Sequence, residues 1–375
     1  NNLIRDTARS FSREQLAPFS AEWDKEARFP KEAITSLGEL GFLGMLVSPE
    51  NGGAGTDHVS YFLALIEIAA GDGSCSTIMS VQNSLVCSPI QSYGTEVQKR
   101  TYLEPLARGE MLGCFGLTEP GAGSDAAALT TRAVKVGDEY VLNGSKQFIS
   151  TGKHADIAVI FAVTDPDAGK KGISAFLVPN SAPGFSCANI EAKLGQNASD
   201  TAHLVFEDCR IPAENLLGQE GEGYKIALSN LEGGRLGIAS QSIGMARSAY
   251  QAAKRYAKER KTFGKVIAQH QAVSFRLADM ATSLQAAELM VLEAARLRDA
   301  GLPCLKEASM AKLFASEMAE RVCSDAIQIH GGYGYLKDYE VERIYRDVRV
   351  CQIYEGTSDI QRLVISREIL QEDDI

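Results

Sequence analysis

The sequence predicts an α+β protein in which a middle β domain separates two helical ones. Apolar residues recur at helical spacing up to about residue 110, and the same spacing returns beyond about residue 220. Between these parts, short runs alternate in the two-residue period of strands, without intervening helices. Such runs imply an antiparallel sandwich or barrel. We therefore predict an N-terminal all-α domain over 1–112, an antiparallel β-barrel over 113–220 and a C-terminal helical bundle over 221–375.

Three segments predict the N-terminal helices. Polar and apolar residues follow a helical pattern from Leu3 to Phe19 and again from Lys31 to Leu40. A compact apolar run from Ser60 to Ala70 also has the length of a helix. The segment 49–55 combines a proline with several glycines, and we expect a loop there.

The middle domain is predicted from strands that short turns connect. The runs 131–136, 139–142 and 145–150 alternate in period two, and the dipeptides Gly137-Asp138 and Asn143-Gly144 separate them. Asn-Gly between alternating runs is the strongest short hairpin signal, so we expect a turn at each dipeptide. Further strands rich in Val, Ile and Phe are expected at 157–163, 173–179 and 201–206.

Two apolar seams predict the C-terminal helices. Apolar residues at three- and four-residue steps run from Val273 to Ala294, and a second stripe runs from Met310 to Ile329. This spacing suits the antiparallel packing of helices in a bundle. We therefore interpret these side chains as core and not as ligands.

Charge and cysteine content argue against several classes of function. The formal net charge of −10 leaves no basic excess to neutralise the phosphates of a nucleic acid. The eight cysteines are scattered without a CxxC pair, so we predict no metal site and expect reduced thiols in a reducing compartment. No apolar stretch reaches the length that spans a membrane, and we expect no membrane insertion.

The segment 121–126, Gly-Ala-Gly-Ser-Asp-Ala, formally matches a dinucleotide-binding fingerprint. Its context disagrees, because Glu119-Pro120 precedes it and no helix of the required length follows. A doubly wound nucleotide-binding fold is therefore not expected. A turn of small residues still lets backbone N–H groups approach an anionic or flat cofactor, so a structural turn and a cofactor loop are equally good interpretations.

The segment 352–362 contains the strongest candidate for acid–base chemistry. Gly356 is expected to end one helix, and Thr357 or Ser358 to cap the next, which runs to about Leu370. Glu355 then lies at the carbonyl pole of a helix, which disfavours a negative charge. If the side chain is also buried, its pKa rises toward neutrality, as a general base requires. The alternative is an exposed glutamate in a capping region.

Three other features have two interpretations each. Three glycines follow His330, and they form either a helix C-cap with a loose loop or a close approach of the backbone to a ligand. His330 itself is interpreted as a packed or capping histidine and not as a catalyst. Arg260 either meets a pyrophosphate or is solvated. Phe148 either stacks on a ring or fills the barrel.

Four segments in combination resemble the acyl-CoA dehydrogenase family. They are Leu-Thr-Glu-Pro-Gly-Ala-Gly-Ser-Asp at 117–125, Arg-Lys-Thr-Phe-Gly at 260–264, Gln-Ile-His-Gly-Gly at 328–332 and Tyr-Glu-Gly-Thr-Ser at 354–358. The resemblance covers essentially the whole chain. It implies a helical domain, a β-barrel domain and a four-helix bundle. It also implies an FAD-dependent oxidoreductase that acts on the CH–CH bond of an acyl-CoA.

The resemblance assigns three groups of cofactor residues and one group for the substrate. The flavin is lined from the barrel side by Phe115, Leu117, Thr118, Gly123, Ser124, Phe148, Ile149 and Ser150. The adenosine diphosphate part is bound, across a subunit contact, by Arg260, Phe263, Gln271, Gln328, Ile329, His330, Gly331 and Gly332. Thr357, Ser358 and Asp359 close over the cofactor. The substrate residues are Ser124, Glu232, Arg235, Tyr354 and Gly356.

The resemblance identifies Glu355 as the catalytic base. Some relatives carry the base on the helix that here contains Gly234, and Gly234 takes the place of that alternative glutamate. Glu232 is close enough in sequence to be a rival. In the implied mechanism, Glu355 abstracts the α-proton, flavin N5 takes the β-hydride and the product is the trans-2-enoyl-CoA. The enolate that forms needs hydrogen-bond donors on the thioester oxygen.

The implied substrate is a short acyl-CoA of the C4–C5 class, straight or 2-methyl-branched. Segments 79–85 and 234–241 are similar to the butyryl-preferring branch, whereas 331–339 is closer to the isobutyryl and 2-methylbutyryl branch. Residues 194–198 depart from the usual family wording. The processes implied are fatty acid β-oxidation and branched-chain amino acid catabolism.

The resemblance also implies an electron-transfer flavoprotein as partner and a homotetramer. The expected location is the bacterial cytoplasm, or the mitochondrial matrix if the source is eukaryotic. Two alternatives keep part of this interpretation. A non-catalytic acyl-CoA or flavin-binding module needs no carboxylate at position 355, and an acyl-CoA oxidase passes its electrons to oxygen.

Overall fold

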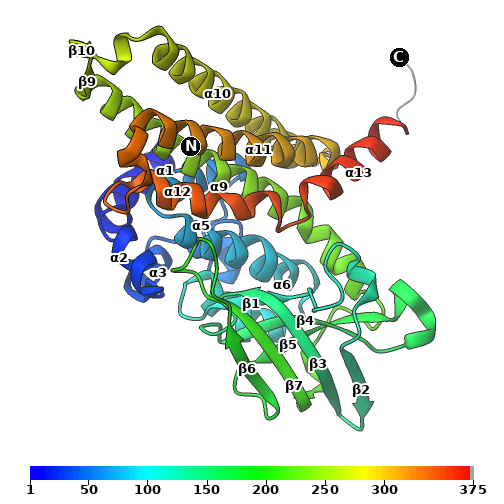
Figure 1. Ribbon diagram of the computed structural model, residues 1–375. Helices are drawn as coiled ribbons and strands as arrows, with labels where there is room; N and C mark the ends of the chain where they lie inside the picture. Colours follow the sequence, from blue (N-terminus) through cyan, green and yellow to red (C-terminus); the bar gives the residue numbers. More distant parts are fainter. Residues whose placement is uncertain (372–375) are drawn as a thin grey trace.

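The computed structural model describes residues 1–371 and divides into helical and β parts in the predicted order (Figure 1). The first part consists of helices, with π-helical turns at 12–16, 81–87 and 99–103. Its α-helices are α1 (Asn2–Phe11), α2 (Ser20–Glu26), α3 (Lys31–Glu39), α4 (His58–Gly71), α5 (Gly73–Ser80), α6 (Ser88–Tyr93), α7 (Glu96–Gln98) and α8 (Glu104–Ala107). The predicted loop at 49–55 contains one 3-10 turn. The helical N-terminal domain is thus confirmed.

The middle part is an eight-stranded sheet, and its hydrogen-bonded order is β6-β7-β3-β2-β4-β5-β8 with β1 beside β4. The strands are β1 (Gly113–Gly116), β2 (Arg132–Val136), β3 (Glu139–Ser150), β4 (Ile157–Val163), β5 (Ile173–Pro179), β6 (Phe185–Ile190), β7 (Thr201–Pro212) and β8 (Leu216–Leu217). Among residues 1–371 this path does not close on itself, so the predicted closed barrel is wrong.

The prediction of a wholly antiparallel sheet is also wrong, because both β1 and β2 pair with β4 in parallel. Strands β2 and β4 share only the pair Arg132–Val163, so the sheet splays at that point. Strand β1 occupies the edge of β4 that β2 leaves unpaired, from Ile157 to Ile160. The sheet is therefore mixed at its centre and antiparallel elsewhere.

Only one of the two predicted dipeptide turns is present. Gly137-Asp138 joins β2 to β3 in a hairpin, as expected. Asn143-Gly144 instead lies inside the continuous strand β3, where the register with β7 shifts. Gly144 has φ +145°, and a Cβ atom there would lie 2.5 Å from Thr131 Oγ1. The Asn-Gly pair marks a glycine-requiring backbone irregularity, but that irregularity is a bulge and not a turn.

Long helices build the C-terminal part. They are α9 (Gly223–Glu259), α10 (Gln271–Asp299) and α11 (Leu305–His330), and the short hairpin of β9 (Lys261–Thr262) and β10 (Lys265–Val266) joins the first two. The shorter helices α12 (Glu340–Val348) and α13 (Ser358–Ile369) both pack on α11. Met280, Leu284 and Val291 of the first predicted seam are buried, as are Met318 and Val322 of the second.

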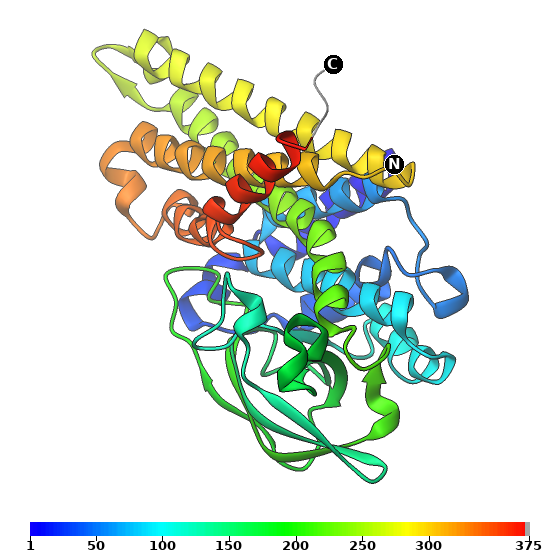
Figure 2. The same ribbon diagram turned by 90° about the vertical axis from the view of Figure 1, so that its right-hand side faces the viewer.

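Helix α9 connects the helical layers to the sheet. In both ribbon views it descends from the layer of α10 and α11 to the strands (Figures 1 and 2). It also packs against α4, so the two helical parts share one hydrophobic core. One further cluster of buried side chains packs the N-terminal helices and the start of α9 against the sheet, and another lies within the β part. Among residues 1–371, no helix is long and apolar enough to cross a membrane.

Candidate active site

Glu355 lies in the connection between α12 and α13, in a left-handed backbone conformation. Helix α12 ends at Val348 and a 3-10 turn continues to Gln352, so the prediction that Gly356 ends the helix is wrong. Glu355 has φ +55° and Gly356 has φ +87°. Thr357 caps α13, as predicted, because its Oγ1 atom accepts a hydrogen bond of 3.3 Å from Ile360 N.

The carboxylate of Glu355 is poorly compensated. Its Oε2 atom is inaccessible to solvent and has no hydrogen-bond partner among the described residues. Burial raises the pKa of Glu355 to about 7, while the charges of Lys312 and Arg235 act in the opposite direction. Burial, and not the pole of a helix, therefore perturbs this group. The interpretation of Glu355 as an exposed capping glutamate is wrong.

Glu355 faces a cavity of about 430 Å³ at the meeting point of the three parts of the chain. Three predicted substrate residues on helices or their connections line it, namely Arg235, Tyr354 and Gly356. The strands and the loop after β1 contribute predicted flavin residues to the same cavity. They are Phe115, Leu117, Thr118, Gly123, Ser124, Phe148, Ile149 and Ser150. Residues more than 230 positions apart in sequence thus share one site.

Phe148 presents a large apolar surface to this cavity. Its side chain is 62% exposed, so the interpretation that it fills the interior of the β domain is wrong. It has φ +60°, and Thr151, three residues later, has φ +63°. Such conformations in residues other than glycine cost about 1–3 kcal/mol each and concentrate at functional sites. The conformation exposes an aromatic face suited to contact with a flat ring.

The N-terminal helices also line the cavity, a role that their sequence does not predict. Thr77, Ser80, Val81 and Leu85 line it from α5 and the π-helical turn that follows. The similarity of segment 79–85 to one branch of relatives predicts no such lining role. Its periodicity is that of an ordinary buried helix, so only the packing of α5 reveals this role.

Glu232 does not belong with these residues. Its carboxylate forms an ion pair of 2.6 Å with Arg298 and accepts a hydrogen bond of 3.1 Å from Cys304 Sγ. It lines an adjacent surface cavity with Lys170 and Lys171, and that cavity shares three lining residues with the Glu355 cavity. Glu232 itself does not line the Glu355 cavity, because α9 turns its side chain toward α10 and the connection before α11. Its assignment to the substrate residues stays a prediction.

Gly234 lies directly against Glu355. A Cβ atom at Gly234 would be 2.6 Å from Glu355 Oε2 and 3.0 Å from its Cδ atom. Positions 234 and 355 therefore compete for the same space, and a side chain at position 234 would displace the carboxylate.

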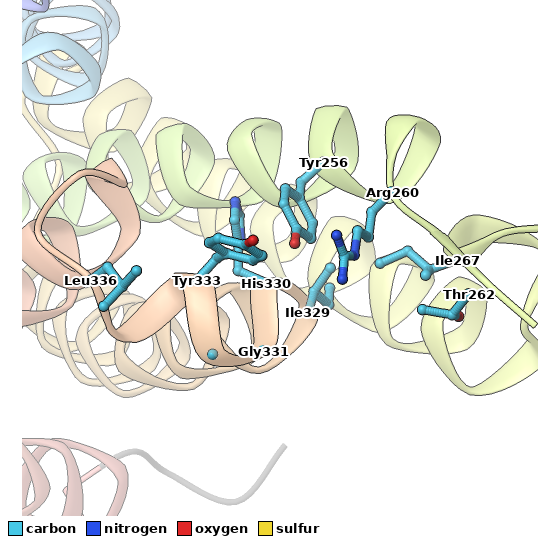
Figure 3. A pocket seen from close by; sticks show the side chains of 10 residues that line it. Tyr256, Arg260, Thr262, Ile267, Ile329, His330, Gly331, Tyr333 and Leu336 are labelled. Carbon is cyan, nitrogen blue, oxygen red and sulfur yellow. The ribbon is translucent and has the colours of Figure 1, made fainter.

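A second cavity, of about 410 Å³, lies where α9 ends beside the end of α11 (Figure 3). It brings together five of the predicted residues for adenosine diphosphate, namely Arg260, Ile329, His330, Gly331 and Gly332. A Cβ atom at Gly331 or Gly332 would meet nothing within 4 Å, so the glycines present open backbone. This cavity shares no lining residue with the Glu355 cavity.

His330 is a packed histidine, as the sequence predicted. Its Nδ1 atom lies 2.7 Å from Ala326 O, and its ring stacks on Tyr256 with centroids 4.4 Å apart. Burial lowers its pKa, which disfavours the charged form. Arg260 lies over the Tyr333 ring, 5.5 Å from its centroid, which leaves its guanidinium at the cavity (Figure 3).

The other predicted cofactor residues line neither cavity. Gln271, Gln328 and Asp359 are exposed, and Phe263 is 96% exposed. The assignment of Phe263, Gln271 and Gln328 to a site across a subunit contact stays a prediction, and so does that of Asp359 to the segment that closes over the cofactor. Ser358 Oγ is inaccessible to solvent and has no hydrogen-bond partner among the described residues. That pattern is typical of a group that waits for a ligand or water.

Family models cover almost the whole described chain. They are described as the N-terminal domain of acyl-CoA dehydrogenase over residues 1–110, its middle domain over 114–209 and its C-terminal domain over 221–370. The chain belongs to the acyl-CoA dehydrogenase family. An acyl-CoA dehydrogenase of Bacillus subtilis is 49% identical over 98% of this chain and 97% of its own. The mitochondrial short-chain specific acyl-CoA dehydrogenase of Rattus norvegicus is 48% identical over 99% and 90%.

Solved structures of acyl-CoA dehydrogenases have the same fold. Butyryl-CoA dehydrogenase from Megasphaera elsdenii superimposes with a TM-score of 0.97 at 43% identity, over 99% of this chain and 98% of that one. A chain from a structure of the electron transferring flavoprotein of Acidaminococcus fermentans gives 0.98 at 48% identity, over 99% and 98%. A glutaryl-CoA dehydrogenase from Mycobacterium smegmatis in complex with FADH2 gives 0.94 at 35% identity, over 100% and 95%.

Members of the acyl-CoA dehydrogenase family are oxidoreductases that act on CH–CH bonds and use FAD. The residues of this chain fit such a cofactor on three observations. Phe148 offers an exposed aromatic face in the Glu355 cavity. The hydroxyls of Ser358 and Thr151 are buried and have no hydrogen-bond partner within residues 1–371. Gly331 and Gly332 leave open space beside Arg260, where a pyrophosphate would find backbone N–H groups and a guanidinium.

Proposed function

We propose that this acyl-CoA dehydrogenase introduces an α,β double bond into a short-chain acyl-CoA, with Glu355 as the base that abstracts the α-proton. The observation that carries the proposal is the uncompensated Oε2 atom of Glu355 in the cavity that Phe148 and Ser150 line from the opposite part of the chain. A carboxylate with a pKa of about 7 balances basicity against ionisation near neutral pH. The relatives named short-chain specific and butyryl-CoA dehydrogenases support the choice of substrate class.

Each part of the cavity has a distinct task in this proposal. When bound, FAD supplies the acceptor for the β-hydride. Phe148, Ile149 and Ser150 would hold the flavin ring, and Arg235 and Tyr354 line the space that the acyl thioester would enter. Glu355 holds the abstracted proton on its carboxylate. Closure of the cavity around these groups excludes water, which strengthens the electrostatic interactions within it.

We propose a C4–C5 acyl group, straight or 2-methyl-branched, which corresponds to fatty acid β-oxidation or branched-chain amino acid catabolism. An electron-transfer flavoprotein is the proposed electron acceptor. The similar chain from the structure of the electron transferring flavoprotein of Acidaminococcus fermentans supports this proposal. We also propose a homotetramer, in which exposed Phe263, Gln271 and Gln328 complete the second cavity of another subunit. The proposed locations are the bacterial cytoplasm and, for a eukaryotic source, the mitochondrial matrix.

Anaerobic bleaching of the flavin absorbance by a panel of acyl-CoAs tests this function. Butyryl-, isobutyryl- and 2-methylbutyryl-CoA should bleach the native enzyme, and their rates rank straight against branched chains. Glu355→Gln should slow bleaching by roughly 10²–10⁴-fold with FAD still bound, because it removes the general base. Glu232→Gln is the matched control and should bleach at close to the native rate.

Other outcomes would identify a different function. Native-like bleaching by Glu355→Gln would remove Glu355 from its role. Absence of bleaching by every acyl-CoA, with binding retained, would favour a non-catalytic binding module. Rapid reoxidation of the bleached enzyme by oxygen would favour an oxidase over a dehydrogenase.

A further inference from the structure

Lys312 is a fully buried amine next to the Glu355 corner. It lies in the third turn of α11, and its exposed fraction is 0%. Lysine is almost never buried to this extent without a partner, because desolvation of an ammonium group is costly. Its Nζ atom donates a hydrogen bond of 2.7 Å to Gly356 O. The lysine thus contacts the peptide that directly follows Glu355.

The backbone that Lys312 contacts is strained. Glu355 has φ +55°, a conformation that an L residue other than glycine adopts only when its surroundings hold it. Two buried side chains donate to this corner. Gln361 Nε2 donates to Glu355 O at 3.2 Å and to Gly356 O at 2.9 Å, and Lys312 donates to Gly356 O from the opposite element. The orientation of the Glu355 side chain depends on this corner.

The charges around Glu355 come from four elements. Lys312 on α11 and Arg235 on α9 favour its carboxylate form, and Arg367 on α13 lines the same cavity. Tyr61 on α4 is the other titratable group that senses Glu355. Burial lowers the pKa of Lys312 to about 8, and Cys351 and Glu355 act in the opposite direction. Near pH 7, Glu355 is therefore divided between its acid and carboxylate forms, whereas Lys312 is mainly an ammonium group.

We infer that Lys312 is a positioning residue for Glu355: its ammonium group anchors the Gly356 carbonyl and places a positive charge near the carboxylate. The inference rests on the proposed role of Glu355 as the base. The hydrogen bond keeps the left-handed corner in one conformation, so that the carboxylate faces the cavity. The charge keeps the carboxylate ionised at a pH at which burial alone would protonate more of it. A lysine that served packing alone would do neither.

Two substitutions in the FAD-loaded enzyme separate the two effects. Lys312→Met removes both the hydrogen bond and the charge, whereas Lys312→Gln removes the charge and keeps an N–H donor. Loss of the positive charge raises the pKa of Glu355, so the acidic limb of kcat/KM should move to higher pH by about one unit in both variants. At pH 9 the carboxylate is ionised, and Lys312, whose pKa is about 8, is mainly a neutral amine that still donates an N–H group to Gly356 O. Lys312→Met should therefore keep kcat about tenfold below native at pH 9, because the corner is loosened. Lys312→Gln should recover most of that loss.

The controls distinguish positioning from packing. Ser316 lies one helical turn further along α11, is equally buried and satisfies its hydroxyl within the helix, so Ser316→Ala should leave the pH profile unchanged. Lys312→Gln also serves as the test if Lys312→Met does not fold. A native acidic limb together with native kcat in a folded, FAD-loaded Lys312 variant would overturn the inference.

A combination of variants separates this inference from the proposed function. In the Glu355→Gln background, Lys312→Gln should cause no further loss of the residual rate, because the two residues act as one unit. An active Glu355→Gln enzyme would disprove the assignment of the base itself. An inactive Glu355→Gln enzyme, with additive loss on Lys312→Gln, would disprove only the role of Lys312.

Discussion

Two neighbouring residues, Tyr354 and Glu355, have opposite surroundings. The Tyr354 hydroxyl donates to Gln241 Oε1 and accepts a hydrogen bond of 3.2 Å from Gln196 Nε2. The adjacent Glu355 has a buried carboxylate oxygen without any hydrogen-bond partner among the described residues. Buried polar groups are nearly always paired, so the contrast within one dipeptide is informative. The Tyr354 hydroxyl is thus fully hydrogen-bonded, whereas the carboxylate of the proposed base is not.

The hydrogen-bond network around Tyr354 joins all three parts of the chain. Thr77 comes from α5, Gln196 from the segment before β7, Gln241 from α9 and Tyr354 from the connection before α13. Gln196 has φ +50°, and its backbone N–H donates to the buried Asp347 side chain. Gln196 belongs to segment 194–198, whose sequence differs from the one usual in the family, so this difference lies in the network. We interpret the network as the rigid base that holds the Glu355 corner against the cavity.

The largest effect is expected from a methyl group placed next to the Glu355 carboxylate. Gly234→Ala places a Cβ atom 2.6 Å from Glu355 Oε2, so the carboxylate must move. We expect kcat to fall by about 100-fold, since a displacement of about 1 Å at a reacting group has such consequences. Steady-state kinetics measure this fall in kcat. Gly233→Ala is the matched control, because its Cβ meets nothing closer than the Arg298 guanidinium at 3.5 Å, and its kcat should remain native.

The second-largest effect is expected from the removal of one side chain from the hydrogen-bond network around Tyr354. Gln241→Met keeps the length of the side chain but leaves the Tyr354 hydroxyl without its acceptor and Thr77 without one of its donors. We expect the stability of the folded state to fall by about 2–3 kcal/mol, because buried polar groups lose their partners. Urea unfolding measures the change. Gln251→Met, at an exposed position of the same helix, should change stability by less than about 0.5 kcal/mol.

The smallest effect is expected from Glu355→Gln, which removes the cost of burying a charged carboxylate. It sharpens the contrast between Glu355 and the hydrogen-bonded Tyr354. Burial raises the pKa of Glu355 from its ordinary 4.5 to about 7, so the folded protein binds a proton more tightly than the unfolded chain. The destabilisation by the carboxylate is therefore complete above pH 7 and disappears below pH 4.5. Glu355→Gln should stabilise the protein at pH 8 by about 1 kcal/mol and less at pH 5.5.

Thermal unfolding at the two pH values measures this difference. Glu232→Gln is the opposite control, since it weakens an ion pair with Arg298 and should lower stability at both pH values. A Glu355→Gln variant that is less stable than the native protein at pH 8 would contradict the description of Glu355 as an uncompensated group.

The local patterns of the chain predicted much of this architecture. The helical spacing of 273–294 and 310–329 identified buried faces of α10 and α11 that the structure confirms. The family motifs selected the residues that meet in the Glu355 cavity. Local pattern failed where one signal has two structural uses. Asn143-Gly144 allows either a turn or a bulge, and only the pairing of β3 with β7 decides which.

The sequence by itself determined the order of the parts and the helical seams, because these depend on residue types and short-range spacing. Glu355 became the candidate base only through the resemblance of its motif to the acyl-CoA dehydrogenase family. Tertiary structure alone decided that the sheet stays open, that Arg298 sequesters Glu232 and that Gly234 lies against Glu355. It also decided the electrostatic state of Glu355. That state depends on burial and on charges from Arg235 and Lys312, which are 120 and 43 residues away in the chain (355 − 235 and 355 − 312). Desolvation and Coulomb interactions depend on distance in space, which no local pattern encodes.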